Sequence, residues 1–371
     1  MKKVLFVIDT LQLGGAEQSL FQNISRFKNI IPVICHIYPG ETLKPKFVES
    51  GIKVYSINLK KKYGFLEAYR HLAKIVKLER PDLMVAYLTR SEIVTRFVGR
   101  SKKIPVVGTF VSDLYSKSYN QDLSFKARTA VSFFRYLNKL TAGLCKGFIA
   151  NSQPIKKSNA KFLAIDPEKV RVINRGRDSK LFPFHLPESL MMARVRFLNI
   201  GRLFPVKGQR DLILGFASFL KQYPDAVLDI IGEGPARESL SSLIKELRLE
   251  QHVFLLGARN DIAAIIHEYD CFVFPSYSEG FSGSVVEAMF AGLPILASDI
   301  AANKELITHL KTGYLFEKGS IEGITNAMLW YINNLPLAKK LAVEANGYAK
   351  MHFEIEQIVA EFEQYLSAMI A

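Results

Sequence analysis

Short apolar runs alternate with longer amphipathic segments along most of the chain. The runs are rich in β-branched residues and have the length of buried strands, whereas the longer segments carry apolar residues at helical spacing. In the first half, strands are predicted at VLFVI, IPVICHIY, DLMVAYL, IPVVGTF and GFIANS. The segment GFLEAYRHLAKIVKLER predicts a helix that ends at Pro81, before the strand DLMVAYL. Strands that alternate with helices predict a mostly parallel α/β sheet covered on both faces.

The same alternation resumes after a stretch that lacks clear periodicity. This stretch, FPFHLPESLMMAR, contains Pro183 and Pro187, and we place an interdomain linker there. A chain of 371 residues is too long for one ordinary domain and suits two. We therefore predict a first domain over residues 1–185 and a second domain over residues 190–350.

The stretch from Cys271 to Ser298 predicts a strand, a loop, a helix and a second strand. Its sequence is CFVFPSYSEGFSGSVVEAMFAGLPILAS. In a parallel sheet such a loop lies at the carboxyl edge, where ligands bind. Gly283 would let the backbone come close to a ligand, and Ser282 and Ser284 can cap the helix. The free N–H groups and positive end of this helix suit a phosphate.

Two carboxylates frame this loop, Glu279 before the helix and Glu287 within its first turns. Carboxylates suit hydroxyl groups better than phosphates, so Glu287 is a candidate for a ribose diol, like the acid of dinucleotide-binding folds. Glu279 would then face the other end of a nucleotide sugar. Alternatively, Glu279 is a solvated loop acid and Glu287 complements the helix dipole. The presence of both acids around one loop favours the ligand site.

Two cations follow another predicted strand. Arg202 and Lys207 lie on the turn after RFLNI, beside Gly201. Two fixed cations can neutralise a diphosphate and stabilise it as a leaving group. The alternative for this turn is a solvated basic loop.

The net charge of +14 is concentrated in the first half of the chain. Residues 1–185 carry 33 Lys and Arg against 13 Asp and Glu, whereas the remaining residues carry 16 against 22. A basic half of this kind predicts an anionic partner. No zinc-finger, RNP or helix-turn-helix pattern supports nucleic acid, so we expect a membrane surface or a phosphorylated acceptor. The three lone cysteines are expected to be buried thiols in a reducing cytosol.

Aromatic and basic residues interleave between Phe110 and Lys146. A basic amphipathic helix with aromatic residues can lie in a membrane interface. The alternative is an ordinary helix with a buried apolar face, whose cations extend past that face to water. No apolar stretch is long enough to span a bilayer. The start MKKVLFVID resembles a signal peptide, but Asp9 interrupts the apolar run, which we interpret as a first strand.

The motifs of the second half resemble the family-four retaining glycosyltransferases. Glu-Gly-Phe, five residues, Glu-Ala-Met and then Ala-Gly-Leu-Pro-Ile resemble their EX7E signature, and Gly-Arg-Leu, three residues, Lys-Gly-Gln resembles another family motif. The opening Gly-Gly-Ala-Glu is also similar to theirs. The resemblance covers nearly the whole chain. It implies the GT-B fold, in which two Rossmann-like α/β domains enclose a cleft, and a last helix over residues 351–371 that packs back on the first domain.

The resemblance also implies roles for single residues. Arg202, Lys207 and Glu279 would be catalytic, with the cations on the donor diphosphate and the acid on the sugar. The loop of Gly14 and Gly15 would face the donor. The other implied donor-binding residues are Gly201, Gly232, Ala258, Arg259, Phe281, Ser282, Gly283, Ser284, Val285 and Glu287.

Two positions depart from the family pattern. Many members carry a His after the strand that corresponds to IPVVGTF, where it faces the transferred sugar. Val111, Ser112 and Asp113 stand there in this chain, so Ser112 or Asp113 is the candidate sugar contact. The family's Asn-Gly-hydrophobic-Asp turn corresponds to NRGRD, which has Arg177 at the hydrophobic position.

The function implied is a retaining glycosyltransferase with a UDP- or GDP-linked sugar as co-substrate and no cofactor. No Asp-x-Asp pair lies in a suitable loop, so we expect catalysis without a metal ion. The basic half suggests a glycan or polyprenyl-diphosphate acceptor in surface polysaccharide or glycolipid assembly. The protein would be cytoplasmic and peripheral on the inner face of the cell membrane. The alternatives are a nucleotide-sugar-binding pseudo-enzyme, an inverting GT-B enzyme and a nucleic-acid-binding protein.

Overall fold

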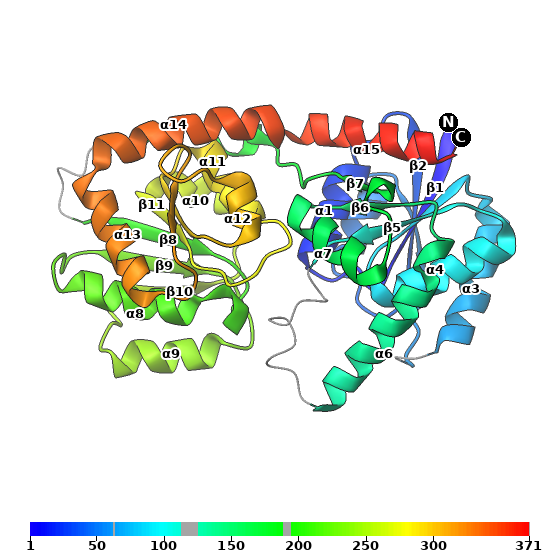
Figure 1. The fold of residues 1–371 in the computed structure, drawn as a ribbon, viewed down its shortest axis with the longest axis horizontal. Coiled ribbons are helices and arrows are strands. Elements are labelled where there is room, and N and C mark those ends of the chain that lie inside the picture. Colours follow the sequence, from blue (N-terminus) through cyan, green and yellow to red (C-terminus); the bar gives the residue numbers. More distant parts are fainter. Residues whose placement is uncertain (62–63, 113–124, 188–193, 371) are drawn as a thin grey trace. The chain divides into compact units, whose positions relative to one another are not determined.

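The computed structural model describes residues 1–61, 64–112, 125–187 and 194–370. Two compact units divide the chain: Met1–Gly176 with Ile355–Ala371, and Arg177–Glu354 (Figure 1). The first unit therefore ends at Gly176, ahead of the predicted boundary at residue 185. The backbone explains this difference, because the Arg177 N–H donates to the Phe353 carbonyl at 2.9 Å, within the second unit.

The first unit is built on a parallel sheet with seven described strands. Their spatial order is β3-β2-β1-β4-β5-β6-β7. Val4 of β1 lies opposite Pro32 of β2 on one side and Leu83 of β4 on the other. The strands are β1 Lys2–Ile8, β2 Ile30–His36, β3 Lys53–Ser56, β4 Leu83–Ala86, β5 Val106–Phe110, β6 Gly147–Ala150 and β7 Val170–Val172.

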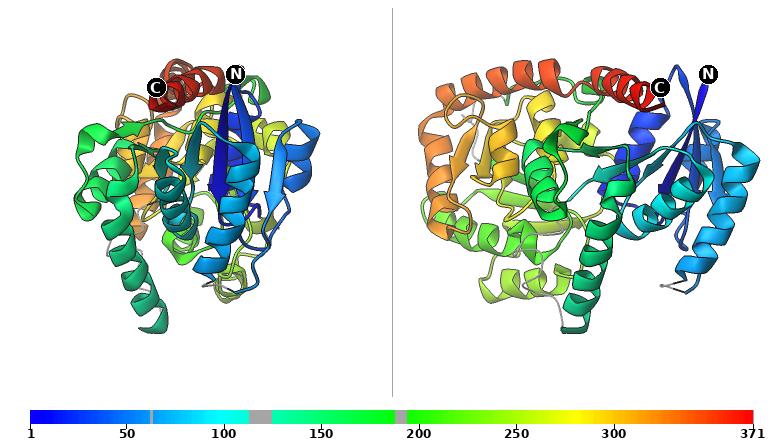
Figure 2. Two further views of the ribbon diagram at one scale, coloured as in Figure 1. Left: turned by 90° about the vertical axis from the view of Figure 1, so that its right-hand side faces the viewer. Right: turned by 45° about the vertical axis from the view of Figure 1, so that its right-hand side comes forward.

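Helices cover both faces of this sheet (Figure 2). Leu5 and Val7 of β1 contribute to one apolar layer, together with α3, α4 and α7. Val4, Phe6 and Ile8 contribute to the opposite layer, with α1, α2 and α15. This alternation is the period of two expected of a strand buried on both faces. The described helices are α1 Gly15–Ile24, α2 Lys44–Glu49, α3 Phe65–Glu79, α4 Thr89–Lys102, α6 Phe125–Thr141, α7 Gln153–Leu163 and α15 Ile355–Ile370.

The last helix, α15, is anchored to the first unit through a buried carboxylate. Glu363 accepts hydrogen bonds from the backbone N–H groups of Lys28, Asn29 and Ile30, at 2.8, 2.7 and 3.2 Å. One residue earlier, Phe362 packs edge-on against Phe6 of β1. These contacts place α15 with the first unit, although the helix before it belongs to the second.

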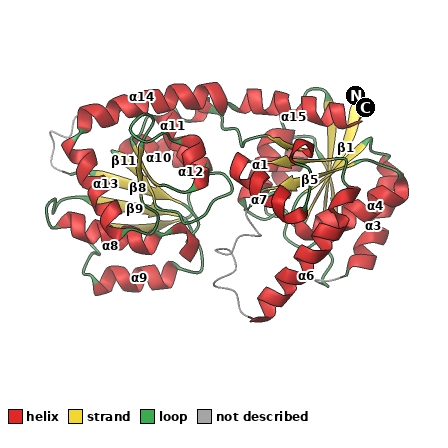
Figure 3. Cartoon of the chain, viewed as in Figure 1, coloured by secondary structure: helices red, strands yellow, loops and turns green. Residues whose placement is uncertain are grey.

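Helices also lie on both sides of the sheet of the second unit (Figure 3). This sheet has six described strands in the order β10-β9-β8-β11-β12-β13, all of them parallel. Helices α8, α9 and α13 contribute to the apolar layer on one face, and α11, α12 and α14 to the other. The strands are β8 Arg196–Ile200, β9 Val227–Ile231, β10 Val253–Gly257, β11 Cys271–Phe274, β12 Ile295–Ser298 and β13 Tyr314–Phe316. The helices are α8 Gln209–Leu220, α9 Arg237–Glu246, α10 Ile262–Ile265, α11 Gly283–Ala291, α12 Ala301–Leu306, α13 Ile321–Asn333 and α14 Leu335–His352.

Candidate functional site

The loops after β8 and β11 meet at the carboxyl edge of the second unit's sheet. These two strands are neighbours, and the strand order runs away from them towards β10 on one side and β13 on the other. Ligands of open α/β sheets bind at such a switch point. The loops touch, because the Tyr277 N–H donates to the Val206 carbonyl at 2.8 Å. Lys207 and Glu279 lie on these two loops.

Lys207 and Glu279 form an ion pair. Lys207 Nζ lies 2.5 Å from Glu279 Oε1, and their side chains are only 16% and 9% exposed. The Ser276 hydroxyl donates to the same carboxylate oxygen at 2.6 Å. Both hydrogen bonds use Oε1, so Oε2 is the oxygen available to a ligand hydroxyl. From the sequence, Lys207 is assigned to the diphosphate and Glu279 to the sugar, and the structure also pairs these two residues with each other.

Arg202 lies on the turn between β8 and α8 and is exposed. Its guanidinium carbon stands 5.0 Å from the ring centre of Phe204, a cation–π distance. Its backbone carbonyl accepts a hydrogen bond from Gln209 Nε2 at 3.2 Å, which fixes the turn. Arg202 is therefore a cation at the solvent side of the switch point, whereas Lys207 is a partly buried cation.

The predicted serine caps of α11 are wrong. Ser282 occupies the N-cap position, but no side chain caps the helix there. Instead, the Ser282 hydroxyl donates to Asn303 Oδ1 at 2.7 Å, and the Ser284 hydroxyl donates to the Ile200 carbonyl at 3.3 Å. The carboxamide of Asn303 competes successfully for the hydroxyl that would otherwise cap the helix. The positive end of α11 therefore carries no side-chain cap, a state that suits an anion.

Glu287, one turn into α11, is paired with Arg177. Arg177 Nε donates to Glu287 Oε1 at 2.6 Å, and the two side chains are 14% and 19% exposed. The guanidinium also lies against Gly283, because a Cβ built there would collide with its Nη2 atom. Gly283 was predicted to make room for a ligand, and the structure puts the Arg177 guanidinium in that room.

A chain of hydrogen bonds between buried side chains leads to the Glu279 carboxylate. Asn303, at the start of α12, accepts from Ser282 and donates through Nδ2 to the Ser298 carbonyl at 2.9 Å. The Ser298 hydroxyl donates to the Ser276 carbonyl at 2.6 Å, and Ser276 bonds to Glu279. Asn303, Ser276 and Ser298 are fully buried. This network ties the loop before α11 to the end of β12 and to α12.

Two glycines of the site contact each other through their backbones. Gly232, with a φ of +148°, has no room for a Cβ, which would collide with the Gly201 carbonyl. The Gly201 N–H in turn donates to the Ile231 carbonyl at 3.0 Å.

Ala258 and Arg259, which the sequence analysis predicts to bind the donor, follow β10 and are exposed. Arg259 pairs with Asp261 at 2.5 Å.

Two predicted donor-binding residues have side chains in the core. Val285 is fully buried in the apolar layer of α11 and α14, and Phe281 is buried against Phe353, with ring centres 5.7 Å apart. Only their backbone atoms are placed to meet a ligand. The apolar side chains act by fixing the start of α11.

The predicted contacts in the first unit surround the amino end of α1 and the carboxyl end of β5. Gly14 is the N-cap of α1, and the Glu17 carboxylate fills the space where a Gly14 side chain would be. Gly15 lies close to Arg175. Ser112 follows β5 and accepts a hydrogen bond at its carbonyl from Asn159 Nδ2 at 3.5 Å. Asp113 lies outside the described residues.

Cavities lie at the carboxyl ends of β4 to β7 in the first unit. One of about 30 Å³ is lined by Asn23 of α1, by Asn151 after β6 and by Arg175 after β7. The side-chain oxygens of Asn23 and Asn151 are buried and have no hydrogen-bond partner in the described part of the chain. A second, smaller cavity is lined by Ser112 and Glu92. Unpaired acceptors of this kind suit water or a ligand hydroxyl.

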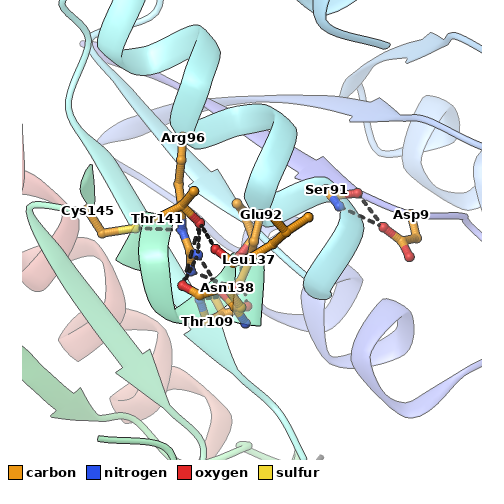
Figure 4. Close-up of polar contacts among 10 residues, drawn as sticks. Asp9, Ser91, Glu92, Arg96, Thr109, Leu137, Asn138, Thr141 and Cys145 are labelled. Atoms are coloured by element: carbon orange, nitrogen blue, oxygen red, sulfur yellow. Dashed lines mark hydrogen bonds and ion pairs between the residues drawn. The ribbon is translucent and has the colours of Figure 1, made fainter. Parts of the chain in front are cut away.

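A buried ion pair includes Glu92, one of the residues that line the smaller cavity. Figure 4 shows this pair and its hydrogen bonds. Arg96 is fully buried, and its Nη2 donates to Glu92 Oε2 at 2.9 Å. The Thr109 N–H donates to the other Glu92 oxygen at 3.0 Å, and Arg96 also bonds to Asn138 and Thr141. Burial raises the pKa of Glu92, and the Arg96 charge opposes that rise. Every charge here is satisfied internally, so the pair is structural.

Two family models account for most of the chain. The model described as Glycosyltransferase Family 4 matches residues 14–181, and the model described as Glycosyl transferases group 1 matches residues 190–348. The chain is a family-four-type glycosyltransferase. The predicted GT-B fold class, with two Rossmann-like domains, is confirmed.

Two curated relatives of this glycosyltransferase act on lipid-linked substrates by name. One is the UDP-Gal:alpha-D-GlcNAc-diphosphoundecaprenol alpha-1,3-galactosyltransferase of Escherichia coli, 28% identical over 70% of this chain and 68% of its own. The other is an N,N'-diacetylbacillosaminyl-diphospho-undecaprenol alpha-1,3-N-acetylgalactosaminyltransferase of Campylobacter jejuni, 27% identical over 84% of this chain and 86% of its own.

Solved structures share the fold of this glycosyltransferase. Anabaena HepE in complex with UDP-glucose superposes with a TM-score of 0.85 at 22% identity, and the match covers 99% of this chain and 100% of that one. At this identity the similarity concerns the fold alone.

Sequence reasoning missed the partners of the predicted residues. In the sequence Arg177 stands out only as a departure from the family turn, and no motif contains Asn303. One signal could have identified Arg177: a basic residue at an expected apolar position requires a nearby acid when it is buried. No comparable signal marks Asn303, because its role depends on the loop it faces.

Proposed function

We propose that this glycosyltransferase transfers a sugar from a UDP-linked donor to a lipid-linked acceptor, with retention of the anomeric configuration and without a metal ion. One observation carries the proposal. The partly buried pair of Lys207 and Glu279 lies at the switch point of the second unit, beside the uncapped end of α11. A cation, a helix end and a carboxylate are what a diphosphate joined to a sugar requires.

Different residues of the site would contact the diphosphate, the sugar and the ribose of the donor. Lys207, Arg202 and the end of α11 would neutralise the diphosphate as negative charge develops on it. Glu279 would accept a sugar hydroxyl through Oε2, because Oε1 is taken by Lys207 and Ser276. Glu287 would accept the ribose hydroxyls in the same way, with Oε1 taken by Arg177.

In the proposed reaction, the bond from the anomeric carbon to the β-phosphate oxygen breaks, and its electron pair goes to the diphosphate. The acceptor oxygen bonds to the same face of the sugar, and its proton passes to the leaving phosphate oxygen. This order needs no dedicated base. Both named relatives form alpha-1,3 linkages, and an alpha product from an alpha-linked UDP-sugar is retention.

The proposal of a lipid-linked acceptor is supported by the positive charge of residues 1–185 and by an exposed apolar surface of the first unit. Both named relatives act on diphospho-undecaprenol substrates. Within the first unit, α6 exposes Phe133, Tyr136 and Leu140 on one face, 57%, 62% and 61% accessible, with Lys139 beside them. This surface, the α6 apolar face, suits the interface of an anionic membrane. No helix of the described ranges is long and apolar enough to cross a bilayer.

A panel of nucleotides tests the donor class. The melting temperature of the protein would be measured with UDP, GDP, ADP, CMP and their common sugar conjugates. A ligand present at a hundredfold its dissociation constant stabilises the folded state by about 2.7 kcal/mol, which such a measurement resolves. We expect UDP and a UDP-sugar to raise the melting temperature. A rise in melting temperature with GDP alone would overturn the UDP assignment. An unchanged melting temperature with every ligand of the panel would overturn the donor site.

A further inference from the structure

Backbone contacts fix the position of Arg177, and its side chain extends from this fixed backbone to the site. Its N–H donates to the Phe353 carbonyl at 2.9 Å, and the residue forms a parallel bridge with Glu354. Both partners lie at the end of the second unit, of which Arg177 is the first residue. The guanidinium is thus presented to α11 from a fixed strand-like segment, 110 residues from Glu287 in sequence.

Gly283 provides the space that the guanidinium occupies. A Cβ at residue 283 would collide with Arg177 Nη2 and lie 3.0 Å from Cζ. The backbone at Gly283 has no positive φ, so the requirement is for space and not for an unusual conformation. Residues 283 and 287 lie one turn apart on the same face of the helix, which lets one guanidinium lie on the glycine and bind the acid.

Glu287 alone would be a poor neighbour for a diphosphate. A carboxylate one turn into α11 places negative charge close to the helix end where the phosphates are expected. Arg177 cancels that charge at a distance of 2.6 Å and leaves the second carboxylate oxygen in position for hydroxyl groups. The pair is mostly shielded from water, so its electrostatic effect is stronger than that of a surface pair.

We propose that Arg177 is a positioning residue of the donor site, which neutralises Glu287 and orients its free oxygen towards the ribose hydroxyls. This inference rests on the proposed function, because it takes the ligand of the site to be a UDP-sugar. It assigns to Arg177 a role in nucleotide recognition at a position where the family resemblance implies a hydrophobic residue.

The first test compares nucleotides with and without ribose hydroxyls. Arg177→Gln is expected to weaken UDP binding about tenfold, the effect of losing a hydrogen bond to a charged group. The loss should shrink to about twofold or less for the 2′,3′-dideoxy analogue of UDP, because that ligand has no hydroxyl for Glu287 to accept. The dissociation constants would be measured by calorimetry. Arg171→Ala is the control, since Arg171 pairs with Glu361 on the exposed surface of the first unit.

The second test uses Gly283 in two backgrounds. Gly283→Ala in the natural protein should expel the guanidinium and weaken UDP binding about as much as Arg177→Ala does. In the Arg177→Ala background no guanidinium fills the space over Gly283, so Gly283→Ala should have no further effect on UDP binding. If Gly283 instead makes room for the ligand, the alanine would weaken UDP binding equally in both backgrounds, and our inference would be wrong.

Three results decide the inference, given that the natural protein binds UDP. Unchanged UDP affinity in Arg177→Gln would overturn it, and so would an equal loss for UDP and its dideoxy analogue, the sign of a merely structural role. Tighter UDP binding in that variant would overturn it as well, and would indicate that Arg177 blocks the site.

If the natural protein binds no UDP, the proposed function fails instead. Should Arg177→Gln not fold, Gly283→Ala and Arg177→Lys provide the same comparison.

Discussion

Lys207 and Glu279 hold each other at 2.5 Å across the two loops that meet at the switch point of the second unit. The ammonium is one of the two cations that we assign to the leaving diphosphate, and the carboxylate is the group that we assign to the sugar. The pair therefore joins the group assigned to the diphosphate and the group assigned to the sugar through one short contact. Neither side chain can be changed without affecting the other.

Lys207→Ala is expected to lower the turnover number by about 10²–10³ with the fold intact, because the developing charge on the diphosphate loses its partly buried cation. The turnover number would be measured at saturating donor. Lys221→Ala is the matched control: Lys221 is exposed at the other end of α8, away from the carboxyl edge of the sheet. Near-normal turnover in Lys207→Ala would contradict the role of this cation.

The double variant Lys207→Met with Glu279→Gln separates stability from catalysis. Lys207→Met alone leaves a mostly buried carboxylate without its partner, so it should lower the free energy of unfolding by about 1–3 kcal/mol. The double variant should recover most of that stability and none of the turnover. Recovery of turnover would mean that the ion pair is structural only.

Removal of metal ions should leave the transfer rate unchanged. In our proposal Lys207, Arg202 and the end of α11 carry out the charge neutralisation that a divalent cation provides in other enzymes. The rate would be measured after dialysis against EDTA, and again after magnesium or manganese is restored. A rate that falls at least tenfold without metal and returns with it would contradict the proposal.

The α6 apolar face should bind anionic vesicles. Replacing Phe133 and Tyr136 together by Ser should lower the affinity for phosphatidylglycerol vesicles about tenfold, because both side chains lose apolar area in the interface. Val343→Ser is the control, since Val343 is an exposed apolar residue of α14 in the other unit. Binding should also weaken as salt rises. Equal affinity of the double variant and the natural protein would exclude this face.

The acid stability of the first unit should depend on Glu79. Hydrogen bonds from Lys53 and Tyr55 lower the pKa of this carboxylate to about 2, from an ordinary value of about 4.5. A depressed acid pKa stabilises the folded state above the unfolded value, and this stability is lost as the pH falls from 4.5 towards 2. Glu79→Gln should therefore cost about 1–2 kcal/mol at pH 7 and almost nothing at pH 2. Urea unfolding at several pH values would measure this, and a cost independent of pH would contradict it.

The fold was predictable because its signals are local. Each strand of a parallel sheet is a short apolar run, and a period of two in β1 divides Val4 and Phe6 from Leu5 and Val7. The loop before α11 was predictable for the same reason, since its glycines, serines and acids are close in sequence. The boundary at Gly176 was not, because it depends on a backbone pairing with Phe353.

The pairings within the site were beyond prediction from sequence. Lys207 and Glu279 are 72 residues apart, and Arg177 and Glu287 are 110 apart. Which loop meets which depends on the strand order, and a pattern of apolar runs leaves that order open. The incorrect serine caps have the same origin: Ser282 had two possible partners, and the one it bonds to, Asn303, comes from a later helix.

The anomeric configuration of the product tests the central claim most directly. The enzyme would be given the UDP-sugar that the nucleotide panel selects and a polyprenyl-diphosphate-linked acceptor, and the new linkage would be read by NMR. We predict an alpha linkage formed from the alpha-linked donor, at a rate that Lys207→Ala lowers by two to three orders of magnitude. A beta linkage would contradict retention. A folded protein that binds UDP but transfers no sugar to this acceptor would contradict the proposed activity.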